Sequence, residues 1–250
     1  MLIIFIHHGV VPYDRAMPPE SDPVREHARK RGRNSSGAET RLKLMTVAET
    51  MFADRGIAAV SLNEIRLAAG QSNAAVVNYH FGSKDELIKA ILADRLERID
   101  ADRGRLLDQA LSGGQPPELS ALLAALVLPQ VSSIERGERH VELVAQLLFR
   151  GYGEPGAHAW ILADPSLTEH GQRLNQLIWS HLSHLPEVVA TTRLRFVYTS
   201  CLNALADHQR QWVTATDAVP TAVFVSDLID SLTAIIRAPA SPETLEALES

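Results

Sequence analysis

The stretch from Ser61 to Phe81 (SLNEIRLAAGQSNAAVVNYHF) constrains the fold most, because it predicts two short helices joined by a tight turn. Ser61-x-x-Glu64 is a capping box, in which each side chain satisfies a free backbone N–H of the other residue. Gly70 supplies the backbone freedom that a sharp turn requires. The first helix has one apolar face at helical spacing, formed by Leu62, Ile65 and Ala69.

The second helix of this stretch is expected to end near His80, and either Ser72 or Asn73 can cap its start. It carries almost no charge and begins next to the small residues Ala74 and Ala75. A helix of this kind can approach the edges of bases closely in the major groove of DNA. Its inner face is expected to consist of Val76, Val77 and His80.

Longer helices are predicted on both sides of this stretch. One should run from about Ser36 to Gly56, opened by the capping box Ser36-x-x-Glu39 and ended by a C′ glycine. Its apolar stripe consists of Leu44, Ala48, Met51 and Phe52. A third capping box, Ser83-x-x-Glu86, opens a helix that can run to about Leu111. Its apolar positions are Leu87, Ile91, Leu92, Leu96 and Ile99.

The run from about residue 40 to 92 resembles the DNA-binding domain of TetR-family transcriptional repressors. The ordered motifs that carry the resemblance are Phe52-x-x-x-Gly56, the Ser61 start, Ala69-Gly70, Tyr79-His80-Phe81 and Ser83-Lys84-x-x-Leu87. The resemblance implies an all-α protein that represses transcription as a dimer and is released from DNA by a small molecule. The N-terminal helix-turn-helix domain would be followed by a C-terminal helical-bundle domain for dimerisation and ligand binding.

The charge distribution agrees with DNA contact at one end of the chain. The 250 residues carry a net charge of −6, yet the segment from Arg25 to Lys43 holds seven basic and two acidic residues, or +5. The remainder therefore carries −11, since −6 minus 5 is −11. A basic arm before a helix-turn-helix suits phosphate contacts, although charge runs are commonly only solvated tails. One cysteine excludes an internal disulfide framework and fits a reducing, cytoplasmic location.

Candidate DNA contacts divide into phosphate and base contacts. Ser61, at the start of one helix, and Lys84, at the start of the next helix, suit phosphate contacts. The ring donors of Tyr79 and His80 can also reach phosphate oxygens. The amides of Asn73 and Asn78 can donate to and accept from adenine, but Asn73 can also serve only as a cap. Asn63 lies where similar proteins sometimes place a base-reading residue. The full candidate set is Arg33, Ser61, Asn63, Ser72, Asn73, Ala74, Ala75, Asn78, Tyr79, His80 and Lys84.

The clearest break in the chain is Ser112–Pro117 (SGGQPP), after which the pattern stays helical. Proline and glycine residues, including Pro129, punctuate helices expected near 118–128, 139–150, 157–163, 168–184, 188–213 and 221–236. The expected organisation is a disordered arm (1–35), a DNA-binding domain (36–84), a connecting helix (83–111), an effector and dimerisation domain (117–237) and a frayed tail (238–250).

The last two long helices are expected to pair with their copies in a two-fold four-helix bundle, mainly because the resemblance implies it. Apolar stripes of this kind are more often core than interface. The candidate interface residues are Leu194, Val197, Cys201, Leu205, Phe224, Leu228 and Leu232.

The C-terminal part is the candidate sensor for an unidentified small-molecule effector, because a helical bundle with a few polar groups in an apolar lining suits one. The alternative for each residue is an ordinary core position. The candidates are Gln146, Tyr152, Trp160, Trp179, His181, Tyr198 and Asn203. A metal site using His181-x-x-His184 with His158 and His170 is disfavoured, because no cysteine or suitably spaced carboxylate joins them.

No catalytic arrangement is expected, and neither is a cofactor or a metal. Gly151–Gly156 matches G-x-G-x-x-G formally, but it follows a helix and contains a proline, which predicts a plain loop. Met1–Val11 is too short to span a membrane and lacks the basic start of a signal peptide, and Met17 offers another start. The sequence predicts a DNA-binding regulator with no membrane partner. The alternatives are a small-molecule-binding or enzymatic bundle with a vestigial head, and a helical protein adaptor.

Overall fold

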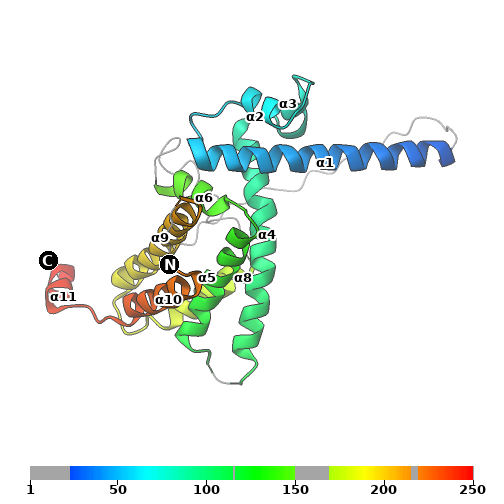
Figure 1. Ribbon diagram of the computed structural model, residues 1–250. Helices are drawn as coiled ribbons and strands as arrows, with labels where there is room; N and C mark the ends of the chain where they lie inside the picture. The colour runs from blue at the N-terminus through cyan, green and yellow to red at the C-terminus, as the bar shows by residue number, and fades with distance from the viewer. Residues whose placement is uncertain (1–22, 115, 150–168, 215–218, 250) are drawn as a thin grey trace. The chain divides into compact units, whose positions relative to one another are not determined.

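The computed structural model describes residues 23–114, 116–149, 169–214 and 219–249. Within these ranges every regular element is a helix and no strand occurs, as Figure 1 shows. The chain divides into two compact units, residues 1–40 and 41–250, and in the first unit the described residues are helical. The expected all-α class is confirmed.

The helices keep the order of the chain and vary widely in length. They are α1 (Pro23–Arg55), α2 (Leu62–Ala68), α3 (Val76–Phe81), α4 (Lys84–Leu111), α5 (Leu119–Glu135), α6 (His140–Phe149), α8 (Glu169–Ser180), α9 (Glu187–Thr214), α10 (Thr221–Arg237) and α11 (Pro242–Glu249).

Helix α1 begins at Pro23 and not at Ser36, where a capping box predicts its start. Proline suits the first helical position, and the arginine, lysine, alanine and glutamate residues that follow are good helix formers. The helix therefore passes through Ser36. Its end agrees with the sequence: Gly56 has a φ of +87°, and its N–H donates to the Phe52 carbonyl at 2.9 Å.

The first of two apolar clusters, the head core, joins α2, α3 and the C-terminal part of α1 to two further helices. Of the expected stripes, Leu44, Ala48, Phe52 and Ile65 have no exposed surface, while Met51 and Leu62 are half-buried against the cluster. Two other helices complete the cluster with Leu87, Ile88, Ile91 and Leu92 of α4 and Leu143, Val144 and Leu147 of α6. Because α6 contributes three buried residues, the head core does not end at residue 84.

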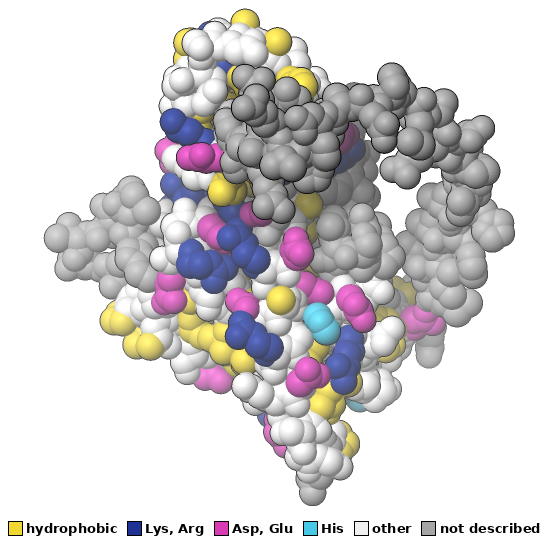
Figure 2. All heavy atoms as spheres, turned by 90° about the vertical axis from the view of Figure 1, so that its right-hand side faces the viewer, with side chains coloured by type: hydrophobic (Ala, Val, Ile, Leu, Met, Phe, Trp, Pro, Cys, Tyr) yellow, Lys and Arg dark blue, Asp and Glu magenta, His cyan; other side chains and the backbone are white. Residues whose placement is uncertain are grey.

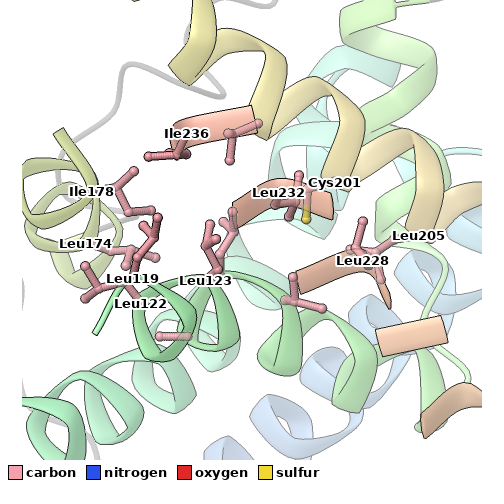
Figure 3. Close-up of a cluster of buried hydrophobic side chains, with 14 of the residues drawn as sticks. Leu119, Leu122, Leu123, Leu174, Ile178, Cys201, Leu205, Leu228, Leu232 and Ile236 are labelled. Atoms are coloured by element: carbon pink, nitrogen blue, oxygen red, sulfur yellow. The ribbon is translucent and has the colours of Figure 1, made fainter. Parts of the chain in front are cut away.

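The second cluster, the body core, is formed by α5, α8, α9 and α10, with Leu107 from α4 and Val141 and Ala145 from α6. In Figure 3 the labelled side chains from these helices point toward one another. They are Leu119, Leu122, Leu123, Leu174, Ile178, Cys201, Leu205, Leu228, Leu232 and Ile236. Burial of this apolar surface holds the body together.

Two predicted breaks are helical in the structure. Helix α5 continues through Pro129 to Glu135, because Pro129 removes only one backbone hydrogen bond while buried residues on both sides of it hold the helix. The tail expected to be frayed forms α11. The Ser241 hydroxyl accepts a hydrogen bond from the Thr244 N–H at 3.3 Å, and a local cap of this kind starts a helix without tertiary contacts.

Among the described residues, no single helix is long and apolar enough to cross a membrane. Helix α5 and the first part of α6 pass that test only as a pair, by length and composition, and the pair is bent by 118°.

Candidate nucleic-acid interface

The start of α2 is fixed by the predicted capping box. The Ser61 N–H donates to Glu64 Oε2 at 2.8 Å, and the Glu64 N–H donates to the Ser61 hydroxyl at 3.2 Å. Arg55 adds an ion pair at 2.6 Å to the same carboxylate. The Arg55 hydrogen bond and the two Ser61 donors lower the pKa of Glu64 to about 2. A phosphate at Ser61 would therefore compete with an ionised carboxylate already held there.

Arg66 braces the turn between α2 and α3, a role that sequence reasoning missed. Its Nε and Nη2 donate to Asn63 Oδ1 at 3.1 and 3.0 Å, and its Nη1 donates to the Gln71 carbonyl at 2.5 Å. Gly70 has a φ of +68°, so the turn uses the backbone freedom expected of it. The three-residue spacing from Asn63 to Arg66 is the signal that could have revealed the pair.

Helix α3 buries one face and exposes the other. Val76, Val77 and Phe81 lie in the head core, and His80 is half-buried. On the open side Asn78 is exposed and Tyr79 is 83% exposed. The helix begins later than expected, at Val76, because Asn73 Oδ1 accepts a hydrogen bond from the Ala75 N–H at 3.0 Å and fixes the turn before it.

The start of α4 anchors α3 from the other side. The Ser83 hydroxyl accepts from the Glu86 N–H at 3.1 Å, which confirms the predicted cap. Glu86 itself pairs with Lys89 at 2.7 Å and does not return to Ser83. Lys84 Nζ donates to the Ile57 carbonyl at 2.8 Å, so this ammonium holds the end of α1.

The side chains predicted to contact DNA therefore differ in whether they already make a hydrogen bond within the chain. Asn78 and Tyr79 are exposed, as are Ser72, Ala74 and Ala75, whereas Asn63, Asn73 and Lys84 each make a hydrogen bond within the chain. Arg33 lies on α1, but its side chain is outside the described residues. The face in Figure 2 mixes basic and acidic side chains and offers no broad basic patch.

Gln146, a predicted effector residue, instead holds the end of α1. Its Oε1 accepts from the Ile57 N–H and its Nε2 donates to the Phe52 carbonyl, both at 2.9 Å. The amide is thus occupied by two backbone groups, and the position acts as a cap for α1 supplied by α6. An effector role for Gln146 stays a prediction.

The other predicted effector residues do not gather at one place. Tyr198 packs against the body core, and its hydroxyl lies 3.4 Å from Asn175 Oδ1. Trp179 is 39% exposed and His181 is half-buried, while Asn203 Nδ2 donates to the Thr199 carbonyl of its own helix at 2.9 Å. Tyr152 and Trp160 lie outside the described residues.

Most of the predicted dimer contacts lie inside one chain. Val197, Cys201, Leu205 and Leu232 are at most 1% exposed, and Leu228 is 7% exposed. Only Leu194 and Phe224 are partly open. The apolar stripes of α9 and α10 pack against each other and against α5, and α9 also packs against α6. A partner cannot reach residues that this body core encloses.

The remaining candidate sites gain no support. Among the described residues no group of three or more His, Cys, Asp or Glu side chains could hold a metal, and His158 and the 151–156 loop lie outside them. An open cleft of about 530 Å³ runs along α4 and contains no predicted effector residue. It is lined by Arg41, Ala90, Ala93, Asp94, Glu97, Asp100, Ala101, Glu169 and His170.

Comparisons with known proteins agree with the helix-turn-helix geometry. Residues 44–91 match the family described as bacterial regulatory proteins, tetR family. The HTH-type transcriptional repressor KstR2 of Mycolicibacterium smegmatis is 33% identical over 44% of this chain and 49% of its own length. The HTH-type transcriptional repressor Rv3405c of Mycobacterium tuberculosis is 34% identical over 31% of this chain and 50% of its own. The chain spans about half the length of these curated relatives.

Similarity in fold extends beyond the helix-turn-helix. NalD, the secondary repressor of the MexAB-OprM multidrug efflux pump in Pseudomonas aeruginosa, superposes with a TM-score of 0.50 at 18% identity. The match covers 80% of this chain and 96% of NalD, so it includes the helical body. The matched relatives are named as regulators or repressors, in agreement with the expectation of a regulator and not an enzyme. Residues 44–91, which hold the helix-turn-helix, therefore match the tetR family of bacterial regulatory proteins, and the similarity to NalD concerns the helical fold.

Proposed function

We propose that the chain represses transcription by binding a pseudo-palindromic operator as a homodimer, and that a small molecule releases it. The observation that carries the proposal is the uncharged, exposed side of α3, where Asn78 and Tyr79 project from a helix whose other side is buried in the head core. A firmly held helix of this kind can enter a major groove and present an amide to base edges. Such a regulator would act in the cytoplasm, where its DNA lies.

Dimerisation is proposed through the outer sides of α9 and α10. Val188 and Phe196 of α9 and Val223 of α10 are 65%, 47% and 57% exposed. Exposed apolar side chains that form one patch mark an interaction surface. A two-fold pairing of these surfaces would bury them and place two α3 helices on successive major grooves. Replacement of Phe196 by aspartate should then yield monomers in light-scattering measurements, while Phe196→Leu should remain dimeric.

Release requires that a change in the body reach α3, and the structure offers a route of direct contacts. Gln146 of α6 holds the end of α1. The backbone N–H of Arg139, the residue just before α6, donates to the Glu49 carboxylate of α1 at 3.0 Å. Arg139 also pairs with Asp54 at 3.0 Å. A ligand that favours a shifted α6 would therefore move α1 and the helix-turn-helix packed on it.

Selection of the operator from random DNA tests the proposal. The selected sequence should be a two-fold repeat with half-sites about one helical turn, or a small multiple, apart. Gel shifts at two salt concentrations should show that the specific complex survives where random DNA is released. A protein that binds every sequence equally, or none, would contradict it.

A further inference from the structure

A buried arginine in the body pairs with an aspartate of its own helix. Arg103 of α4 is 6% exposed, and its Nη1 donates to Asp100 Oδ1 at 2.8 Å. Both residues belong to the same helix, so this ion pair joins no two elements. The Arg103 Nε is also buried and finds no hydrogen-bond acceptor among the residues that the structure describes. A buried donor without a partner is costly, which calls for an explanation.

Asp100 has structural partners of its own. Its Oδ2 accepts from the His170 N–H and its Oδ1 from the Gly171 N–H, both at 2.9 Å. These are free N–H groups at the start of α8, where the helix dipole favours a negative charge. Asp100 could therefore cap α8 even if Arg103 were absent. Because Asp100 shares its charge with that helix end, the charge of Arg103 is only partly balanced.

Arg103 faces polar and apolar groups from the other body helices. Its positive charge acts on Tyr198 and Cys201 of α9, opposing the burial that raises the pKa of each to about 12. Both groups therefore stay protonated near neutral pH and place no negative charge beside Arg103. Tyr198 packs against the body core and Cys201 belongs to it, as does Leu107 one turn after Arg103 on α4.

We propose that Arg103 anchors the effector, and that the effector is an apolar molecule with one carboxylate, which the guanidinium of Arg103 binds and the hydroxyl of Tyr198 helps to hold. A carboxylate would supply the missing acceptor and balance the charge, since a guanidinium offers donors matched to its two oxygens. The apolar remainder of the ligand would lie among the aliphatic side chains of the body core. The inference rests on the proposed ligand response.

The first experiment uses the full-length protein and matched probes. Straight-chain and aromatic monocarboxylates of increasing size are each compared with their primary amides, which keep the shape and lose the charge. At least one acid should raise the melting temperature and release the selected operator, and its amide should do neither. If no acid has an effect, or if acid and amide act equally, the inference fails.

The second experiment identifies the anchor. Arg103→Met should weaken the active acid about tenfold or more, Arg103→Lys less, and Tyr198→Phe by a smaller factor, because a charged hydrogen bond contributes more than a neutral one. Arg105→Met, on the exposed side of the same helix, is the matched control. Equal acid affinity in wild type and Arg103→Met overturns the inference. Should Arg103→Met fail to fold, Arg103 is structural and the inference fails too.

The two proposals can fail separately. Operator binding by the wild type without ligand tests the proposed function, and the control variant Arg105→Met should bind the operator as wild type does. Release of wild type by an uncharged probe, with no response to any acid, would keep the proposed function and refute the role of Arg103.

Discussion

The Arg95 guanidinium of α4 forms a buried ion pair with the Glu49 carboxylate of α1, in which Nη2 and Oε2 are 2.7 Å apart. Their side chains are only 5% and 3% exposed. Glu49 also accepts the Arg139 N–H, which comes from the segment just before α6. One carboxylate thus joins three parts of the chain, and the head core depends on its partners.

Replacement of Arg95 by methionine should destabilise the protein by about 3–5 kcal/mol, because it leaves Glu49 buried without its countercharge. Urea unfolding measures the loss. Arg105→Met provides the control, since Arg105 is 74% exposed and its pair with Asp102 should contribute less than ~1 kcal/mol. If both variants lost a similar free energy of unfolding, the buried ion pair of Arg95 would be no more important for stability than the exposed pair of Arg105.

Replacement of Gln146 by leucine should cost about 1–3 kcal/mol, since the Ile57 N–H and the Phe52 carbonyl would lose their partner. The same variant should weaken operator binding or its release by ligand, because α6 would no longer hold the end of α1. Gln109→Leu, at an exposed position of α4, is the matched control and should change neither. Wild-type stability in Gln146→Leu would refute the capping role.

Stability should fall as the pH drops below 6.5, in part through His140. Its ring lies between Gln130 and Ser133, and burial lowers its pKa from 6.5 to about 3. The unfolded chain therefore takes up a proton between pH 6.5 and about 3 that the folded chain rejects. This lowers the free energy of unfolding by up to about 1.4 kcal/mol per pH unit.

The measurement is urea unfolding across that pH range, with His140→Gln as the comparison. Glutamine does not titrate, so the variant should start less stable and lose less stability as the pH falls. Buried carboxylates contribute to the pH dependence of both proteins, and the difference between the two curves isolates His140. Parallel curves would show that His140 does not titrate as described.

Replacement of Asn78 by alanine should reduce operator affinity by about 1–3 kcal/mol while random DNA is bound as before, because a base contact carries sequence preference. Lys84→Ala should weaken binding to all sequences and lower stability as well, since Lys84 holds the Ile57 carbonyl. Fluorescence anisotropy on operator and random duplexes measures both. Equal losses on both duplexes for Asn78→Ala would remove its proposed role in base recognition.

Local signals made much of this fold predictable. Ser61, Glu64 and Ser83 form their hydrogen bonds within three residues, and the stripe through Leu44, Ala48 and Phe52 needs only helical periodicity. These features depend on the chain near each residue. The sequence alone therefore determined the all-α class and the helix-turn-helix.

Tertiary structure decided which faces are covered and which polar groups are used. Val197, Cys201 and Leu232 could have faced a second subunit by pattern, and only the packing of α9 and α10 on each other and on neighbouring helices made them core. Gln146 lies 89 residues from Ile57, so its capping role has no local signal. An amphipathic pattern shows that a helix face will be buried, but the partner that buries it depends on how distant helices pack.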